Sequence, residues 1–169
     1  NASGNAQSED LPMEFPAAEE IEAAFSPDGL VGSLYNDFEP RDEQVVMAKE
    51  VLKAFSTSTN LVVEAGTGVG KSMAYLLPSA LGALRSGSRI GVATKTNALL
   101  DQIVYKELPP LKSTLADAGV GDLSYVALKG FSHYPCMRKV SHIVSDGART
   151  VNVTGKDVSQ APSIAALLS

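Results

Sequence analysis

The chain has 169 residues, of which 44% are hydrophobic and 20% are charged, and its formal net charge is −5 at pH 7. This balance is that of an ordinary globular domain, and it excludes a protein that binds nucleic acid through a strongly basic overall charge. The single cysteine excludes an internal disulfide and fits a reducing, cytoplasmic location. No apolar run approaches the ~18 residues of a membrane span, so we expect no contact with a membrane.

The first forty residues predict a tail and a helical leader. Residues 1–12 are mainly polar and are expected to be disordered. In residues 13–40, apolar positions recur at helical spacing before and after the turn at Ser26–Gly29. We expect one helix over 16–25 and a second over 30–38, and both would cover a larger core.

A longer helix is predicted after Pro40, because proline suits the first turn of a helix. Apolar residues then recur at Val45, Ala48, Leu52 and Phe55, which predicts a buried stripe. Two polar residues, Arg41 and Gln44, lie at the head of this helix and are expected to point away from the stripe.

A glycine-rich stretch follows the apolar run Leu61–Val63 and precedes a helical pattern. A strand, a turn that ends in Gly-Lys-Ser, and a helix make up the phosphate-binding loop pattern. Glycines let backbone N–H groups converge on phosphate oxygens, and the helix N-terminus adds partial positive charge. Lys71 would reach the outer phosphates, and Ser72 would offer its hydroxyl to Mg²⁺. The candidate nucleotide site comprises Ala65, Gly66, Thr67, Gly68, Val69, Gly70, Lys71 and Ser72. The alternative is a flexible turn between two core elements, which does not explain a Lys-Ser pair at the helix entrance.

Helices and strands alternate in the rest of the first 130 residues. Strands are predicted over 89–94 and 123–128, a helix over 97–108 that Pro109-Pro110 ends, and a further helix over 111–118. Such alternation predicts an α/β fold, with a parallel sheet flanked by helices and ligands at the carboxyl ends of the strands.

An acidic motif for hydrolysis is missing from the pattern. A phosphate-loop ATPase needs an acidic residue after a second apolar strand to hold Mg²⁺ and position water. Leu61–Glu64 precedes the loop, and His142–Asp146 is too polar. We therefore expect an incomplete domain, with weak nucleotide binding and negligible turnover by the isolated chain.

Several ordered motifs resemble those of the DinG/XPD-type DNA helicases over roughly residues 13–140. They are Phe38–Arg41 with Gln44 (similar to the Q-motif), Glu64–Ser72 (motif I), Ala74–Pro78 (its usual continuation), Thr94–Asn97 (motif Ia) and Leu128–Cys136 (the segment with the first iron–sulfur cysteine).

The resemblance implies an incomplete RecA-like P-loop NTPase domain of a superfamily-two motor, with the helicase motor part over residues 41–130. Residues 131–169 would begin an inserted iron–sulfur-type helical region. The family's acidic motif, second motor domain and remaining cysteines would lie beyond Ser169. The implied activity is ATP-dependent unwinding of DNA from 5′ to 3′ by a cytoplasmic enzyme of DNA repair.

The resemblance also implies a role for individual residues. Arg41 and Gln44 would contact adenine, and Lys71 would balance β/γ-phosphate charge. Thr94, Lys95 and Thr96 would touch the backbone of single-stranded DNA. The implied cofactors are ATP and Mg²⁺, together with a four-iron four-sulfur cluster that Cys136 would help to ligate in the intact protein.

Each role has a plainer alternative. Arg41 and Gln44 suit an ordinary helix start, Thr96 suits a helix cap, and a lone cysteine is most often a small buried apolar residue. For the chain as a whole, the alternatives are another phosphate-loop NTPase, such as a small-molecule kinase, and a non-catalytic nucleotide-binding module. The sequence does not identify protein partners.

Overall fold

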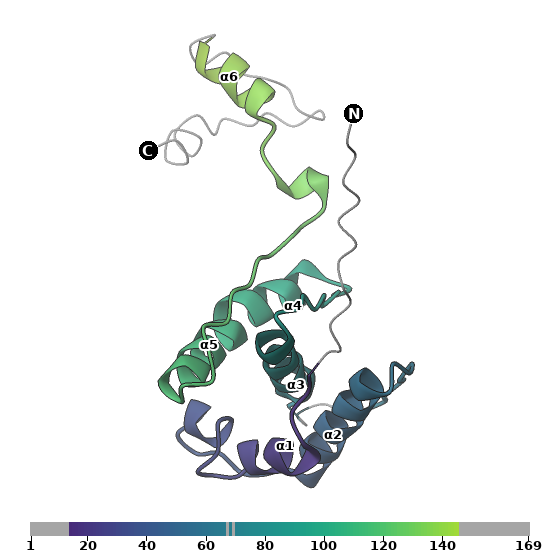
Figure 1. Cartoon of the computed structure of the whole chain (residues 1–169). Helices are drawn as coiled ribbons and strands as arrows, with labels where there is room; N and C mark the ends of the chain where they lie inside the picture. The colour runs from purple at the N-terminus through teal and green to yellow at the C-terminus, as the bar shows by residue number, and fades with distance from the viewer. Residues whose placement is uncertain (1–13, 67, 69, 146–169) are drawn as a thin grey trace, which may run out of the picture. The chain divides into compact units, whose positions relative to one another are not determined.

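The computed structural model describes residues 14–66, 68 and 70–145 (Figure 1). The chain divides into two compact units, residues 1–127 and 128–169. The predicted tail at 1–12, Thr67 and Val69 of the phosphate loop, and the last part of the predicted insertion, residues 146–169, lie outside the described residues.

The regular structure in the described ranges is helical. The first unit contains α1 (Ala18–Ala24), the short helix η1 (Gly32–Leu34), α2 (Asp42–Ser56), α3 (Lys71–Ser86), α4 (Asn97–Gln102), the π-helical turn η2 (Ile103–Glu107) and α5 (Leu108–Asp117). The second unit contains the 3₁₀ turn η3 (Phe131–His133) and α6 (Met137–Ser145). None of these helices is long and apolar enough to cross a bilayer.

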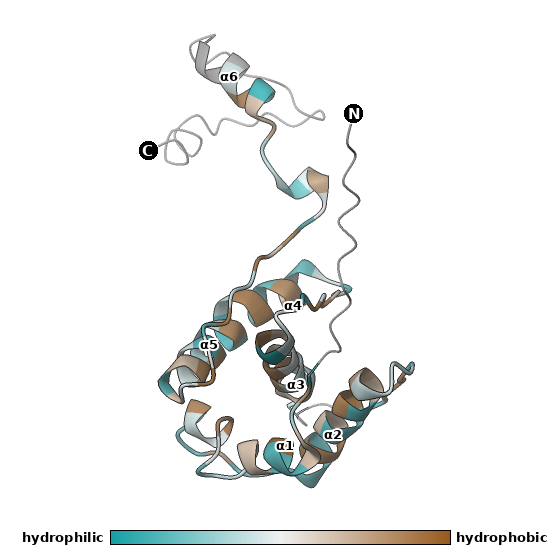
Figure 2. Cartoon of the chain, in the orientation of Figure 1, coloured by the Kyte–Doolittle hydropathy of each residue, from teal (hydrophilic) through white to brown (hydrophobic). Residues whose placement is uncertain are grey.

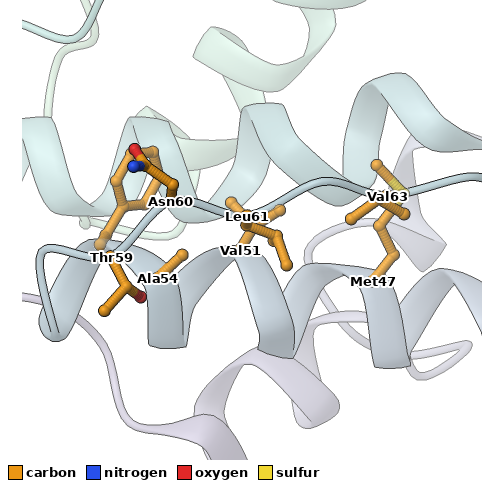
Figure 3. A pocket seen from close by; sticks show the side chains of 8 residues that line it. Met47, Val51, Ala54, Thr59, Asn60, Leu61 and Val63 are labelled. Atoms are coloured by element: carbon orange, nitrogen blue, oxygen red, sulfur yellow. The ribbon is translucent and has the colours of Figure 1, made fainter.

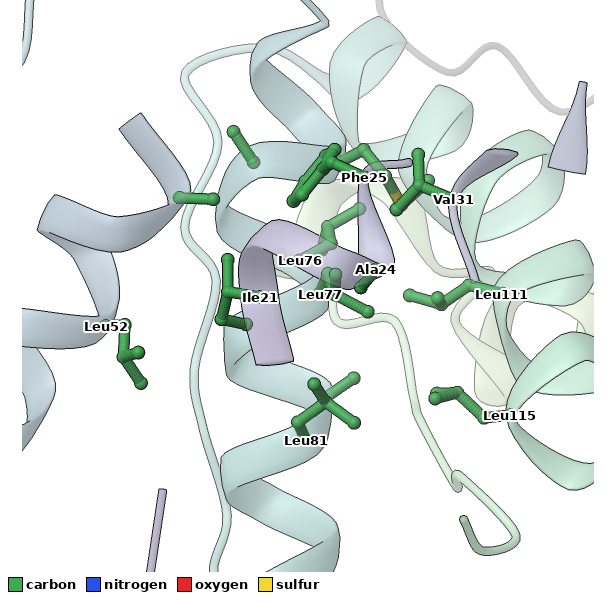
Figure 4. Close-up of a cluster of buried hydrophobic side chains, with 14 of the residues drawn as sticks. Ile21, Ala24, Phe25, Val31, Leu52, Leu76, Leu77, Leu81, Leu111 and Leu115 are labelled. Atoms are coloured by element: carbon green, nitrogen blue, oxygen red, sulfur yellow. The ribbon is translucent and has the colours of Figure 1, made fainter. Parts of the chain in front are cut away.

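Helix α3 lies at the centre of the hydrophobic core. It packs along α2 and also contacts η2. Its Leu77 and Leu81 are fully buried, and Leu111 and Leu115 of α5 belong to the same cluster (Figure 4). Apolar and polar residues alternate along the helices (Figure 2), as expected when each helix buries one face.

The leader contributes large side chains to this core. Phe25 of the α1 C-cap is 1% exposed, and Phe15 stacks on Phe55 of α2 with ring centroids 5.6 Å apart. An ion pair of 2.9 Å between Glu22 and Lys49 adds a polar link between α1 and α2. The second predicted leader helix is reduced to the short turn η1.

The predicted strands are not formed as a sheet within the described residues. The stretches 61–64, 89–94 and 123–128 form no strand. Val62 is 96% exposed and Val126 is 79% exposed, whereas a strand inside a parallel sheet would bury such side chains. A strand is stabilised by backbone hydrogen bonds to a neighbour, and the apolar pattern of one segment does not supply that neighbour. The RecA-like sheet therefore remains an expectation from the resemblance.

The prolines at 109 and 110 do not end the helix, contrary to the sequence prediction. They occupy the first turn of α5, where a missing N–H costs little because first-turn N–H groups have no partner inside the helix. Because proline has no N–H, the carbonyls one turn before Pro109 and Pro110 receive no hydrogen bond from these two residues. The chain passes through the wider π-helical turn η2 at that point.

Replacing Leu77 by alanine should lower the free energy of unfolding by about 2–5 kcal/mol, because the site is fully buried in the middle of α3. The control is Val46→Ala on α2, whose side chain is 60% exposed and whose change should stay within about 0.5 kcal/mol. Urea unfolding followed by circular dichroism measures both. Equal losses in the two variants would contradict the core described above.

Candidate nucleotide-binding site

The phosphate loop ends in a left-handed glycine at the point where α3 begins. Gly70 has φ 76° and ψ 35°, and Gly68 has φ 84°. Residues with a Cβ adopt this conformation at a cost, which explains glycine at both positions. Helix α3 then runs for 16 residues from Lys71. Its N-terminus presents unpaired backbone N–H groups and partial positive charge beside the loop.

A hydrogen bond from α2 holds the end of this loop. The Gln44 side chain is buried at 5% exposure, and its Nε2 donates to the Gly70 carbonyl at 2.9 Å. The prediction that Gln44 points away from the buried stripe is therefore wrong, because it lies on the same face as Ala48 and Leu52. A spacing of four residues places all three side chains on one side of the helix.

This contact fixes the orientation of a peptide group that could bind phosphate. The Gly70 carbonyl and the Lys71 N–H belong to one planar peptide and point in opposite directions. A donor on the carbonyl side therefore turns the Lys71 N–H away from Gln44. Arg41 acts on the loop in a similar way, because its guanidinium donates to the Gly68 carbonyl.

The Lys71 ammonium folds back over the loop that precedes it. Its Nζ donates to the Ala65 carbonyl at 3.0 Å and to the Gly66 carbonyl at 2.5 Å. A Cβ built on Gly66 or Gly68 would meet no heavy atom of the described residues within 4 Å, so the loop is open on that side. A cation and free space beside a helix N-terminus fit a phosphate group.

Two tyrosines of the first unit, Tyr35 and Tyr75, experience the charge of Glu107. Burial raises the pKa of Tyr75, the nearby Ser72 hydroxyl lowers it, and the negative charge of Glu107 raises it further. The pKa of Tyr35 is raised by burial and then by the same carboxylate. Glu107 accepts a 2.7 Å hydrogen bond from Gln102 Nε2.

The predicted DNA-contact residues lie at the start of α4. The Thr96 hydroxyl accepts a hydrogen bond from the Leu99 N–H at 3.3 Å, so the helix cap that the sequence suggested as an alternative is present. The Thr94 hydroxyl donates to the Thr96 carbonyl at 3.1 Å. Lys95 is exposed.

The second unit provides one exposed thiol, at Cys136, directly before α6. The alternative of a small buried apolar residue is therefore wrong. An iron–sulfur cluster of the family type needs four thiolates, and this chain has one cysteine. Nowhere in the described ranges do three His, Cys, Asp or Glu side chains gather as metal ligands. The residues present therefore do not fit the cluster without further cysteines.

An apolar hollow lies between α2 and the predicted strand that leads into the loop (Figure 3). It is lined by Met47, Val51, Ala54, Phe55, Thr59, Asn60, Leu61 and Val63. None of the candidate site residues lines it, and its walls offer no charge for a phosphate. It is therefore distinct from the candidate nucleotide site.

The structure thus brings Arg41, Gln44 and Lys71 together at the loop. Tyr75 and Glu107 were not singled out from the sequence. The spacing of three residues between Ser72 and Tyr75 could have indicated that they share a helix face. No local pattern predicts that the charge of Glu107 acts on Tyr75, because the two residues belong to different helical elements whose packing the sequence does not specify.

Gly70→Ala should destabilise the protein by about 1–3 kcal/mol, because alanine is strained at a positive φ. Its Cβ would also clash with Gln44 Nε2, and Gln44 is buried. Gly66→Ala is the matched control, since its Cβ meets open space. Urea unfolding should separate the two variants, and identical curves would argue against the Gln44 contact.

Glu107→Gln should lower the pKa of both Tyr35 and Tyr75, because it removes a negative charge that opposes ionisation of the phenols. The pKa of each phenol is raised above 10.0 in the folded state, so folding favours the neutral phenol. The resulting contribution to the free energy of unfolding is fully present below pH 10 and is lost as the pH rises through the folded-state pKa values. Phenolate absorbance during an alkaline titration measures the shift. The control is Glu50→Gln, which should leave the titration unchanged.

The chain is similar in sequence to several bacterial helicases. It is 35% identical over 128 residues to the ATP-dependent DNA helicase YoaA of Haemophilus influenzae, and this match covers 76% of the chain and 19% of the relative. It is 41% identical over 105 residues to the ATP-dependent helicase DinG of Mycobacterium tuberculosis (strain H37Rv), covering 62% of the chain and 16% of the relative. It is 33% identical over 116 residues to the 3'-5' exonuclease DinG of Bacillus subtilis, covering 69% of the chain and 12% of the relative.

The chain therefore spans less than a fifth of the length of these relatives. No family model matches it, and no solved structure matches it. The matched residues include more than half of the chain in each comparison, at identities of 33% to 41%. On this similarity the chain belongs to the DinG/YoaA family.

Proposed function

We propose that this chain is the ATP-binding part of an ATP-dependent DNA helicase that unwinds DNA from 5′ to 3′ in the intact protein. One observation carries the proposal: the Lys71 ammonium and two left-handed glycines meet at the N-terminus of a 16-residue helix. This arrangement fits a nucleotide phosphate. The relatives are named ATP-dependent helicases, which supports ATP as the nucleotide and DNA as the substrate.

Lys71 would bind the outer phosphates of ATP. In the structure its ammonium already lies against the loop, where it bonds the carbonyls of Ala65 and Gly66. Side-chain rotation alone would exchange these neutral acceptors for phosphate oxygens, and charge-assisted hydrogen bonds are the stronger ones. The backbone N–H groups of the loop, including those of Thr67 and Val69, would complete the phosphate contacts.

Arg41 and Gln44 would serve both the loop and the adenine base. Each donates to a loop carbonyl in the structure. A glutamine side chain has two N–H donors and a carbonyl acceptor, so the bond to Gly70 leaves capacity for the edge of a base. Occupation of the adenine site would then be coupled to the shape of the phosphate loop.

Thr94, Lys95 and Thr96 would contact the phosphates of single-stranded DNA. Lys95 is exposed beside the first turn of α4, where its charge can reach a phosphate. The Thr96 hydroxyl caps this helix, so its main contribution would be to order the turn that presents Lys95. Such contacts position a strand without selecting its sequence.

Ser72 would ligate Mg²⁺ bound to ATP, through a hydroxyl in the first turn of α3. Cys136 would be one thiolate ligand of a four-iron four-sulfur cluster in the intact protein, once three further thiolates are supplied. We place this protein in the cytoplasm and assign it a role in DNA repair, in keeping with a DNA substrate and the single free thiol of Cys136.

Lys71→Ala should weaken binding of a fluorescent ATP analogue by about 10- to 100-fold, because a hydrogen bond to a charged group contributes roughly 1.5–3 kcal/mol. It should also abolish the ATP hydrolysis that single-stranded DNA stimulates in the intact protein. The fold should be retained, since the lost charge acts on the ligand rather than on the core. The control is Lys53→Ala on α2, where the ammonium is exposed and 3.8 Å from Glu50. Unchanged binding in Lys71→Ala would remove this residue from its assigned role.

A further inference from the structure

Helix α4 and the π-helical turn η2 bury one side and expose the other. Ile103 is 3% exposed and belongs to the hydrophobic core. Tyr105 follows two residues later and is 69% exposed, because side chains two positions apart on a helix point to nearly opposite sides. The ring of Tyr105 therefore presents a large apolar surface to solvent, and Lys106, the next residue, is exposed as well.

The exposed side continues toward the predicted DNA-contact residues. Ala98 and Gln102 are exposed and lie four residues apart, and Lys106 follows Gln102 by a further four. Spacings of three and four residues place side chains on one helix face, so these three residues and Tyr105 form a single exposed stripe. The exposed stripe leads back to the first turn of α4, which begins shortly after Lys95.

A hydrogen bond across the π-helical turn engages the carboxylate that follows Lys106. Gln102 Nε2 donates to Glu107 Oε1 at 2.7 Å, and the two residues are five positions apart. A π-helical turn closes this separation, whereas the α-helical repeat is nearer four residues. Neither Lys106 nor Lys95 forms an ion pair within the described part of the chain. Both ammonium groups can therefore bind an anion of another molecule.

Single-stranded DNA supplies both of the groups that the exposed stripe can bind. Its phosphates carry the negative charge that the two lysines attract, and its unpaired bases offer flat faces to an aromatic ring. In a duplex, these faces are covered by the neighbouring bases of the stack. An acidic peptide would pair with the lysines but would offer no ring to Tyr105.

We propose that the exposed stripe is a further contact surface for single-stranded DNA, on which Tyr105 stacks against a base and Lys106 binds a backbone phosphate. The inference rests on the proposed function in taking DNA as the substrate, and it extends the contacts of Thr94, Lys95 and Thr96 along the helix. At 1.5 Å per residue, Lys106 lies about 15 Å beyond Thr96, so the two ends contact different nucleotides. Because every base has a face to stack on, Tyr105 strengthens binding without selecting a sequence.

The test is the fluorescence anisotropy of a labelled oligodeoxythymidine bound by the full chain, repeated with an oligonucleotide of equal length whose bases are replaced by abasic sites. Tyr105→Ala should weaken binding of oligodeoxythymidine by about 5- to 100-fold, the range expected for one stacked base. Its affinity for the abasic oligonucleotide should equal that of wild type, because no base is left to stack. Tyr105→Phe keeps the ring and should bind both as wild type does. The control is Tyr125→Ala, which removes a 37% exposed ring outside the exposed stripe.

The dependence of affinity on salt tests Lys106. Lys106→Gln should reduce the slope of log affinity against log salt concentration by about 0.7, the value expected for one phosphate of a single strand. Lys53→Gln on α2 is the matched control, because this lysine is also exposed and lies outside the exposed stripe. Its slope should equal that of wild type.

Equal losses on the two oligonucleotides, or oligodeoxythymidine binding by Tyr105→Ala equal to that of wild type, would overturn the stacking contact. An unchanged salt slope in Lys106→Gln would overturn the phosphate contact. A wild-type chain that binds an ATP analogue but no oligodeoxythymidine would overturn the exposed stripe as a DNA surface while leaving the nucleotide site in place. A chain that binds no ATP analogue but gives the expected DNA results would contradict the nucleotide site and support the exposed stripe.

Discussion

The hydrogen bond from Gln44 to the Gly70 carbonyl joins the core of the first unit to its candidate site. Gln44 is buried in the face of α2 that carries Ala48 and Leu52, and α2 packs along α3. The amide can therefore hold the loop only while the two helices remain packed. A buried amide without this acceptor would carry a desolvation cost of roughly 1–3 kcal/mol, so the bond favours one arrangement of helices and loop.

Helix α3 contributes both to the hydrophobic core and to the candidate site. Its middle forms the centre of the core through Leu77 and Leu81, while its first turn carries Lys71 and Ser72. Fixing the apolar face by packing also fixes where the helix begins and which way its N–H groups point. The left-handed Gly70 then turns the chain into that first turn. The stability of the core and the geometry of the candidate phosphate site are consequently coupled through one element.

Sequence patterns predicted the long helices well, because their evidence is local. The apolar stripe after Pro40 and the Gly-Lys-Ser entrance located α2 and α3 closely, and the family resemblance is supported by the relatives. The sheet was a different kind of inference, since a strand depends on partners that its own residues do not specify. Gln44 shows the same limit, because the pattern predicts that this polar residue points away from the buried stripe, whereas it completes a buried contact.

The site could be predicted in part for similar reasons. The spacing of the glycines and of the Gly-Lys-Ser triplet predicted the loop and its lysine. The family resemblance implied a role for Arg41 and Gln44. Their hydrogen bonds to loop carbonyls could not be foreseen, because they depend on how α2 packs beside α3. Glu107 acts on Tyr75 because η2 contacts α3, and this packing joins segments that are distant in the sequence. Each of these contacts depends on how the helices pack together, which the local sequence does not specify.

Hydrogen exchange of the backbone amides, with and without ATP and Mg²⁺, tests the nucleotide site most directly. If the loop binds phosphate, the amides of Gly68, Gly70 and Lys71 should exchange more slowly when nucleotide is present. Amides in the apolar hollow beside Val51 and Leu61 should be unaffected. Protection confined to that hollow, or no protection of the loop at saturating nucleotide, would contradict the assignment of this glycine-rich turn as a phosphate-binding site.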